Sequence, residues 1–291
     1  MRAAITVLRE RFGAQRSICV THADLPGNDF SALFDTLHAD PDSYLRGQPN
    51  VFPVAIGRSF FESLLPPAQV SLGWSSYAAQ WLSRVPALIP GHFIEMCATE
   101  AQREAFIAQA ATDWRTFLSL RARELRPSGR LVMLLPAIDA AGRNGTESVF
   151  DAANECLGEL VACGTIGDVE RSRMVIPNRV RGRAELLAPF AETGSFAGLV
   201  VEHCDISHGR DTMWDAYRAH GDGRLVATEW ARFFRSTFVP TLAVALDPAR
   251  PPADRPTFAN ALEAALARRL EREPFEVPQT LATMVLTRQP G

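Results

Sequence analysis

The chain has 291 residues, of which 47% are hydrophobic and 22% are charged, a composition typical of a soluble globular protein with one or two domains. A net charge of −3 without a dense basic run argues against a nucleic-acid binder, and no apolar stretch is long enough to span a membrane. The N-terminus lacks the apolar core of a signal peptide, and the five cysteines form no CxxC pair. We therefore expect a cytoplasmic protein with reduced, mostly buried thiols.

The first third of the chain alternates strands with helices. An amphipathic helix is predicted from the first residue to Phe12, a strand over 17–21, a helix from Phe30 capped by Asn28 and Asp29, and a second strand over 51–55. Asp24 stands where the first of these strands should end. An acid in that place commonly binds ribose hydroxyls in nucleotide-binding folds, although Asp before Pro-Gly is also a turn former. The alternation predicts an α/β protein.

The stretch Val70–Pro86, VSLGWSSYAAQWLSRVP, is the centre of the prediction. Its apolar start is typical of a buried parallel strand. Tyr77 and Trp81 follow four residues apart, a spacing that places both rings on one face of a helical turn. They form either an aromatic floor with O–H and N–H donors beyond the end of a strand or simply part of the core.

Later elements are predicted from the same kinds of pattern. Apolar runs predict strands over 131–135, 199–202 and 281–286, the last returning beside the first of these three, and helices are expected from Thr146, over 227–246 and over 258–270. Arg121, Arg123 and Glu124 are expected on a solvated helix, and the basic segment Arg171–Arg183 on a solvated surface. His203, Cys204 and Asp205 do not have zinc-site spacing, so a strand end is favoured there.

Three motifs, DLPGNDF at 24–30, SFF…LLP at 59–66 and SSY…WLS.VP at 75–86, follow one another in an order and spacing that carry a resemblance. They resemble the SABATH carboxyl methyltransferases, which use S-adenosylmethionine. The block from Leu120 to Val132 resembles the next helix and strand of that family. The resemblance implies a Rossmann-like, doubly wound methyltransferase sheet with a helical cap.

The resemblance also implies roles for individual residues. The expected cofactor-binding residues are Asp24 at the ribose, Leu25 by the adenine, and Ser59 and Phe60. The expected acceptor-binding residues are Tyr77, Gln80, Trp81, Trp74, Asp151 and Ala152, with the indole N–H of Trp81 holding a carboxylate. No catalytic acid or base is expected. Some family members bind a metal near the cap, but the matching region has Cys97 and Ser172 in place of oxygen-rich ligands, so no metal is predicted.

The family begins with a strand and a cofactor loop that this sequence lacks, so we expect a sheet without its first strand and with unpaired inner strands. The expected organisation is an N-terminally incomplete methyltransferase core over 1–145, a helical cap over 146–198, and a return to the sheet over 199–226. Cap helices with a Pro-rich linker would follow over 227–270, and the last core strand over 271–291.

The predicted function is methyl transfer from S-adenosylmethionine to the carboxylate of a small acid, with no nucleic-acid or membrane partner. Dimers among relatives imply a possible homodimer. Two alternatives stay open. One is a truncated, non-catalytic remnant or binding subunit, and the other is a nitrogen methyltransferase like those of the caffeine branch of the family.

Overall fold

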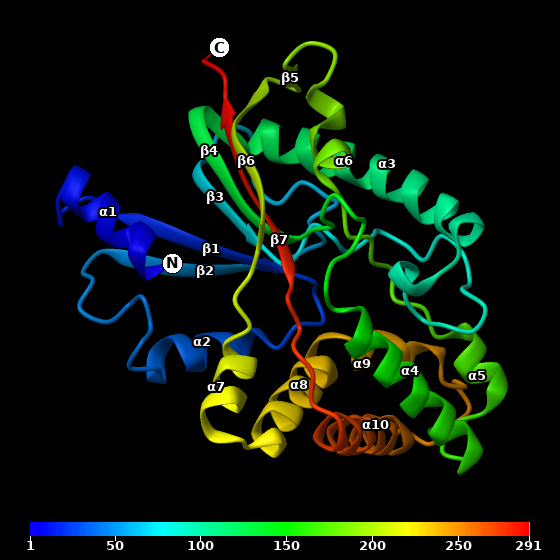
Figure 1. Cartoon of the computed structure of the whole chain (residues 1–291). Coiled ribbons are helices and arrows are strands. Elements are labelled where there is room, and N and C mark those ends of the chain that lie inside the picture. Colours follow the sequence, from blue (N-terminus) through cyan, green and yellow to red (C-terminus); the bar gives the residue numbers. More distant parts are fainter. Residues whose placement is uncertain (291) are drawn as a thin grey trace. The chain divides into compact units, whose positions relative to one another are not determined.

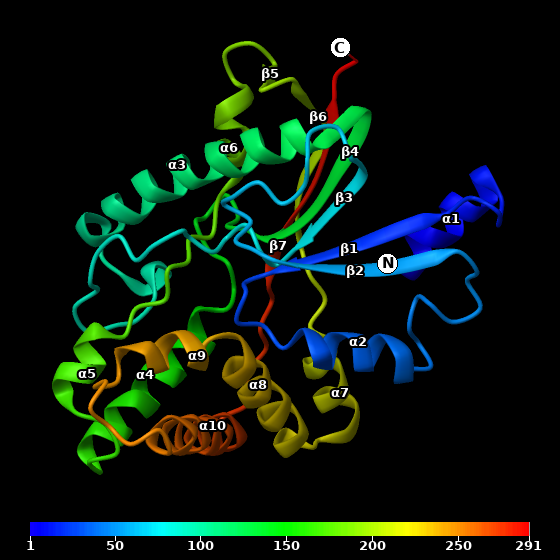
Figure 2. The same cartoon turned by 180° about the vertical axis from the view of Figure 1, so that it is seen from behind.

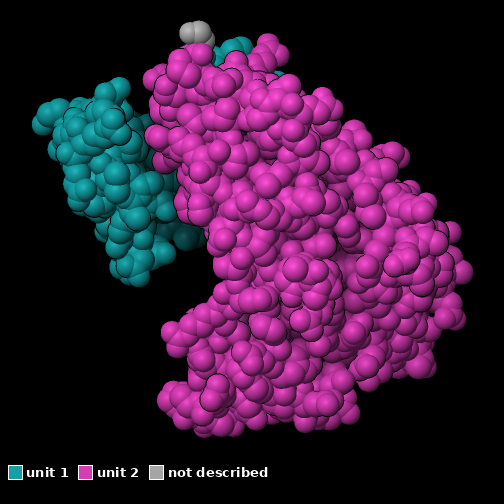
Figure 3. All heavy atoms as spheres, turned by 45° about the horizontal axis from the view of Figure 1, so that its top comes forward, with its two compact units in different colours: residues 1–69 teal, residues 70–291 magenta. Residues whose placement is uncertain are grey.

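The computed structural model describes residues 1–290 as two compact units, residues 1–69 and residues 70–290 (Figure 3). None of the helices described is long and apolar enough to cross a bilayer.

The first unit is a two-stranded parallel sheet with two helices. It contains α1 (Arg2–Phe12), β1 (Ile18–Asp24), α2 (Phe30–Ala39) and β2 (Val51–Gly57). All four elements confirm the predictions, and the Asp29 side chain caps α2 by accepting from the Ala32 N–H at 2.9 Å. The register pairs Asp24 with Gly57, so both strands end at the same edge.

The second unit is built on a mixed sheet in the order β3-β4-β7-β6-β5. Its strands are β3 (Val70–Ser76), β4 (Leu125–Pro136), β5 (Ser195–Phe196), β6 (Leu199–His208) and β7 (Thr280–Arg288). β3 runs parallel to β4, and β7 lies antiparallel between β4 and β6. The predicted return of the last strand beside β4 is therefore confirmed. His203 and Cys204 lie in the middle of β6, which continues to His208, and not at the strand end that their sequence favours.

β1 and β3 are each the terminal strand of their own sheet.

Helices cover the five-stranded sheet and form a separate helical layer (Figures 1 and 2). The helices are η1 (Glu95–Cys97), α3 (Glu100–Glu124), α4 (Glu147–Ala162), α5 (Asp168–Arg173), α6 (Arg183–Leu187), η2 (Ala188–Phe190), α7 (Thr212–His220), α8 (Gly223–Thr237), α9 (Val239–Leu242), η3 (Ala243–Ala245) and α10 (Asp254–Arg272). α4, α8, α9 and α10 enclose the largest hydrophobic core, which includes Phe150, Phe234 and Phe238. The helix expected over 227–246 is interrupted at Phe238. A new short helix, α9, begins at Val239 with Pro240 in its first turn.

Three predictions of exposure were wrong. Arg121 and Glu124 are only 8% and 3% exposed, because they lie on the buried face of α3. They form an ion pair with 2.8 Å between Arg121 Nε and Glu124 Oε2. Arg181 is also buried, although its segment was expected on the surface. Of the five cysteines, all of them unpaired, only Cys156 is buried, while Cys163, which was expected in the core, is exposed.

Candidate active site

The residues predicted to bind the cofactor gather at one edge of the first unit. Asp24 ends β1, and its backbone carbonyl accepts from the Arg58 N–H at 2.7 Å, which brings the loop after β2 beside the end of β1. Ser59 and Phe60 follow directly in that loop. The Ser59 hydroxyl accepts from the Phe61 N–H at 3.2 Å, which holds the turn.

The chemistry of this edge suits a nucleoside. Asp24 is exposed, and one of its carboxylate oxygens, Oδ1, accepts from the Leu25 N–H at 2.7 Å. This hydrogen bond orients the carboxylate toward solvent at the strand end, where it can accept from two ribose hydroxyls. The side chain of Leu25 is 58% exposed, and the Phe60 and Phe61 rings lie 4.6 Å apart, so apolar surface for a base lies next to the acid.

Three of the residues predicted to bind the acceptor, Tyr77, Gln80 and Trp81, lie on a turn immediately after β3, in the second unit. The predicted helical turn is wrong, because Tyr77 has a φ of 52° and Trp81 forms an isolated bridge with Asn178. A bulky side chain in the left-handed region costs on the order of 1–3 kcal/mol, and the surrounding structure must maintain it. Such strain is typical of residues held for function.

Hydrogen bonds hold this turn from inside. The Tyr77 hydroxyl donates to Gln279 Oε1 at 2.9 Å, and partial burial raises the pKa of Tyr77. Gln80 is 6% exposed and donates through Nε2 to the Tyr77 carbonyl at 2.7 Å. Its Oε1 is buried and has no partner. An acceptor left in that state is costly unless a bound group supplies a donor.

Trp81 lies at the border between this turn and the helical core. Its ring is 5.9 Å from that of Phe238, in a tilted arrangement. The indole N–H makes no hydrogen bond with any residue that the structure describes. The Trp81 ring thus packs against Phe238, as the core interpretation expects, while its indole N–H is available to a ligand.

A segment far along the chain fixes this turn. The Leu82 N–H donates to the Pro177 carbonyl at 2.7 Å, and the Arg179 N–H donates to the Gln80 carbonyl at 2.9 Å. Arg181 donates to the carbonyls of Ala79 and Ala110 at 2.7 and 2.9 Å.

Arg181 lies 5.5 Å from the Trp114 ring, and burial lowers its pKa to about 10, so it stays charged at neutral pH. The sequence did not suggest that Arg179 or Arg181 belonged near the site.

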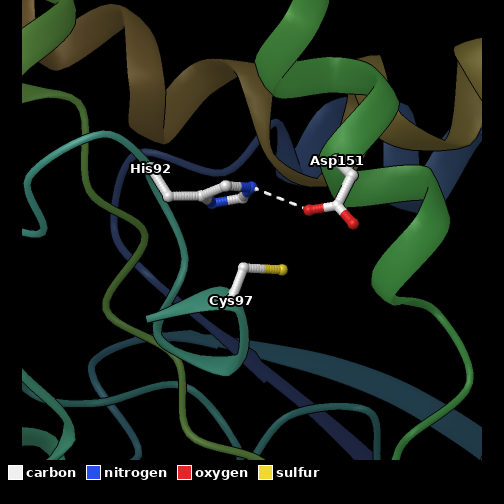
Figure 4. A group of neighbouring side chains, drawn as sticks. All are labelled: His92, Cys97 and Asp151. Carbon is white, nitrogen blue, oxygen red and sulfur yellow. Dashed lines mark ion pairs between the residues drawn. The ribbon is translucent and has the colours of Figure 1, made fainter. Parts of the chain in front are cut away.

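The other three predicted acceptor residues have different surroundings. Trp74 is on β3 and is 58% exposed. Ala152 is 2% exposed within the same hydrophobic core that contacts Trp81. Asp151 is exposed and lies 3.4 Å from His92, with Cys97 beside both of them (Figure 4). Burial, reinforced by the charge of Asp151, raises the pKa of the Cys97 thiol to about 12.

The chain matches the sequence profile of a known protein family. The sequence profile described as "SAM dependent carboxyl methyltransferase" matches residues 3–271. The chain belongs to this family of S-adenosylmethionine-dependent methyltransferases. The predicted family and its cofactor are therefore confirmed.

The individual relatives are distant in sequence, with identities below 30%. Salicylate carboxymethyltransferase of Clarkia breweri is 27% identical over 228 residues, which are 74% of this chain and 60% of the relative. Probable caffeine synthase 5 of Camellia sinensis is 28% identical over 194 residues, which are 60% and 51% of the two chains. The chain thus spans between half and two thirds of the length of these curated relatives.

The structure of a loganic acid methyltransferase with SAH matches with a TM-score of 0.74 at 17% identity, over 99% of this chain and 79% of that one. This similarity confirms the methyltransferase fold.

Proposed function

We propose that this protein transfers the methyl group of S-adenosylmethionine to the carboxylate of a small, aromatic or apolar acid, and so forms a methyl ester. The observation that carries the proposal is the unpartnered indole N–H of Trp81 on a turn that several hydrogen bonds hold rigid. A preorganised N–H donor of this kind orients a carboxylate without taking its proton.

The chemistry requires little more of the protein. A carboxylic acid with a pKa of about 4 is ionised at neutral pH. Its carboxylate oxygen can therefore act as the nucleophile without a general base. The cofactor, when bound, supplies an electrophilic methyl group on a sulfonium. We propose that Asp24, Leu25, Ser59 and Phe60 bind it.

We propose that Tyr77, Gln80, Trp81, Trp74, Asp151 and Ala152 line the acceptor site. The small side chain of Ala152 leaves more room than a bulky aromatic residue would. The buried, unpartnered Oε1 of Gln80 favours an acid that also carries a hydroxyl or N–H donor.

Nitrogen methylation is the second candidate, because the caffeine synthases among the relatives bear that name. A non-catalytic binding role is the third. Calorimetry with S-adenosylhomocysteine distinguishes an enzyme, which must bind it, from a remnant that does not. Transfer of a labelled methyl group to a panel of aromatic acids, hydroxy acids and xanthines then separates the acceptor classes. Labelling of xanthines but not acids would overturn the carboxyl proposal.

A further inference from the structure

Three metal-ligating side chains from different elements converge in the second unit. His92 precedes η1, Cys97 ends η1 and Asp151 lies on α4, and Figure 4 shows the three side chains directed toward a common space. One ligand atom from each lies within 4.8 Å of the others. The distance from His92 Nε2 to Asp151 Oδ1 is 3.4 Å.

The His92 side chain of this cluster is mostly buried, whereas the side chains of a solvated surface are exposed. The His92 side chain is only 9% exposed, and its Nε2 atom is buried without a hydrogen bond of normal length. The Asp151 side chain is 62% exposed, so the cluster is open on one side. A nearly buried nitrogen without a good partner, directed at a thiol and a carboxylate, is the arrangement that an additional bound group would satisfy.

We propose that His92, Cys97 and Asp151 form a binding site for a borderline-soft divalent cation, of which Zn²⁺ fits best, with the fourth coordination position open to solvent. In a tetrahedral zinc site with bonds of about 2.0–2.3 Å, neighbouring ligand atoms are ~3.3–3.8 Å apart. The His92–Asp151 pair already has this separation, and the sulfur needs a shift of about 1 Å or less. The lack of oxygen-rich ligands argues against Mg²⁺ but not against a thiophilic ion.

Binding is balanced in protons and charge. The Cys97 thiol releases its proton to solvent and coordinates as thiolate, so thiolate and carboxylate together neutralise the dication. The His92 ring proton must move from Nε2 to Nδ1, because Nε2 becomes the ligand. The contact from the Ile94 N–H to Nδ1 is then lost. At 3.2 Å it is at the long end of the hydrogen-bond range, and its loss makes the site weaker than a preformed structural zinc site.

The ion would connect η1 to α4 and stabilise the folded chain. The test titrates metal-free protein with Zn²⁺ by calorimetry and with Co²⁺ by absorption spectroscopy, because a thiolate ligand to Co²⁺ gives a charge-transfer band in the near ultraviolet. We expect one ion per chain and a thiolate band that Cys97→Ser removes and Cys163→Ser, at an exposed cysteine, retains.

Variants decide whether these three side chains are the ligands. Cys97→Ser and His92→Gln should each weaken Zn²⁺ binding by about 10-fold or more, and Cys163→Ser should leave it unchanged. Thermal unfolding of each variant without metal confirms that it folds, and if one ligand variant does not fold, the other supplies the test. Equal affinity in the wild type and in a folded ligand variant, or a Co²⁺ complex without a thiolate band, would overturn the site. These readouts do not depend on whether the protein methylates any acceptor.

Discussion

The guanidinium of Arg181 donates to the carbonyl oxygen of Ala79 at 2.7 Å, although the two residues are 102 positions apart. Arg181 also reaches the Ala110 carbonyl on α3, so a single buried side chain connects the turn after β3 to the helix that covers the sheet. The carbonyl of Arg181 accepts from the Ile138 N–H at 3.2 Å, which brings in the loop after β4. The ends of two neighbouring strands are thus held by one residue.

Replacement of Arg181 by Met should lower both stability and acceptor affinity. Two buried carbonyls lose their donor, and each unpaired group costs about 1–3 kcal/mol, so the free energy of unfolding should fall by about 2–5 kcal/mol. Arg181→Lys should retain part of the lost free energy of unfolding, because an ammonium group can reach one of the two carbonyls. We expect a higher acceptor KM with unchanged affinity for S-adenosylhomocysteine. The exposed Arg173→Met is the matched control, and equal KM values for Arg181→Met and wild type would contradict this role.

Trp81→Phe tests the donor to the carboxylate. The substitution keeps an aromatic ring against Phe238 but removes the indole N–H, which has no partner within the described chain. A hydrogen bond to a charged group is worth about 1.5–3 kcal/mol, so kcat/KM for the acceptor should fall about 10- to 100-fold. The midpoint of thermal unfolding should change little. Unaltered kinetics would remove Trp81 from the acceptor site.

Asp24→Asn tests the cofactor edge. The amide keeps the shape of the side chain but replaces one acceptor oxygen with a donor and removes the charge. We expect binding of S-adenosylhomocysteine to weaken about 10-fold or more, measured by calorimetry. Asp35→Asn, an exposed acid on α2, is the control and should bind as the wild type does. Equal affinity in all three proteins would place the ribose elsewhere.

The sequence predicted most elements of the sheet, because their signals are local. Apolar runs that end at turn residues or at an acid are correct for β1 to β4, β6 and β7, with boundaries that shift by a few residues. The turn after β3 was assigned the wrong conformation for a tertiary reason. Its backbone follows the bridge from Trp81 to Asn178 and not its own helical spacing, and residues 97 positions apart give no local signal.

Buried charges were missed for the same reason. Arg179 is ion-paired with Glu95 at 2.7 Å and with Glu185 at 3.1 Å, and Glu95 itself is 1% exposed. A basic segment is usually solvated, and its partners could be found only from the folded chain. Likewise, no local pattern brings His92, Cys97 and Asp151 together, because Asp151 is separated from the other two by more than fifty positions.

Glu170 on α5 binds the segment before α10 through its carboxylate, and this contact gives a prediction on pH. Its two oxygens accept from Arg250 at 2.6 and 2.7 Å and from the backbone N–H groups of Asp247 and Gly167 at 2.8 and 2.7 Å. The Arg250 hydrogen bonds, more than any other contact, lower the pKa of Glu170 to about 2 from an ordinary 4.5. The charged form is therefore favoured by folding, and its contribution to stability is fully present above pH 4.5.

Glu170→Gln should consequently reduce the free energy of unfolding by about 1–3 kcal/mol at pH 7, since it leaves Arg250 without its strongest partner. The difference from wild type should stay constant between pH 7 and 5 and shrink as the pH falls from 4.5 toward 2, because the unfolded wild type binds the proton over this range while the folded protein does not until about pH 2. Urea unfolding of both proteins at a series of pH values measures this difference in the free energy of unfolding. Glu229→Gln, at an exposed pair with Arg232, should change stability by less than about 0.5 kcal/mol at any pH. A Glu170→Gln difference that did not depend on pH below 4.5 would mean that the lost contribution comes from packing of the side chain and not from its charge.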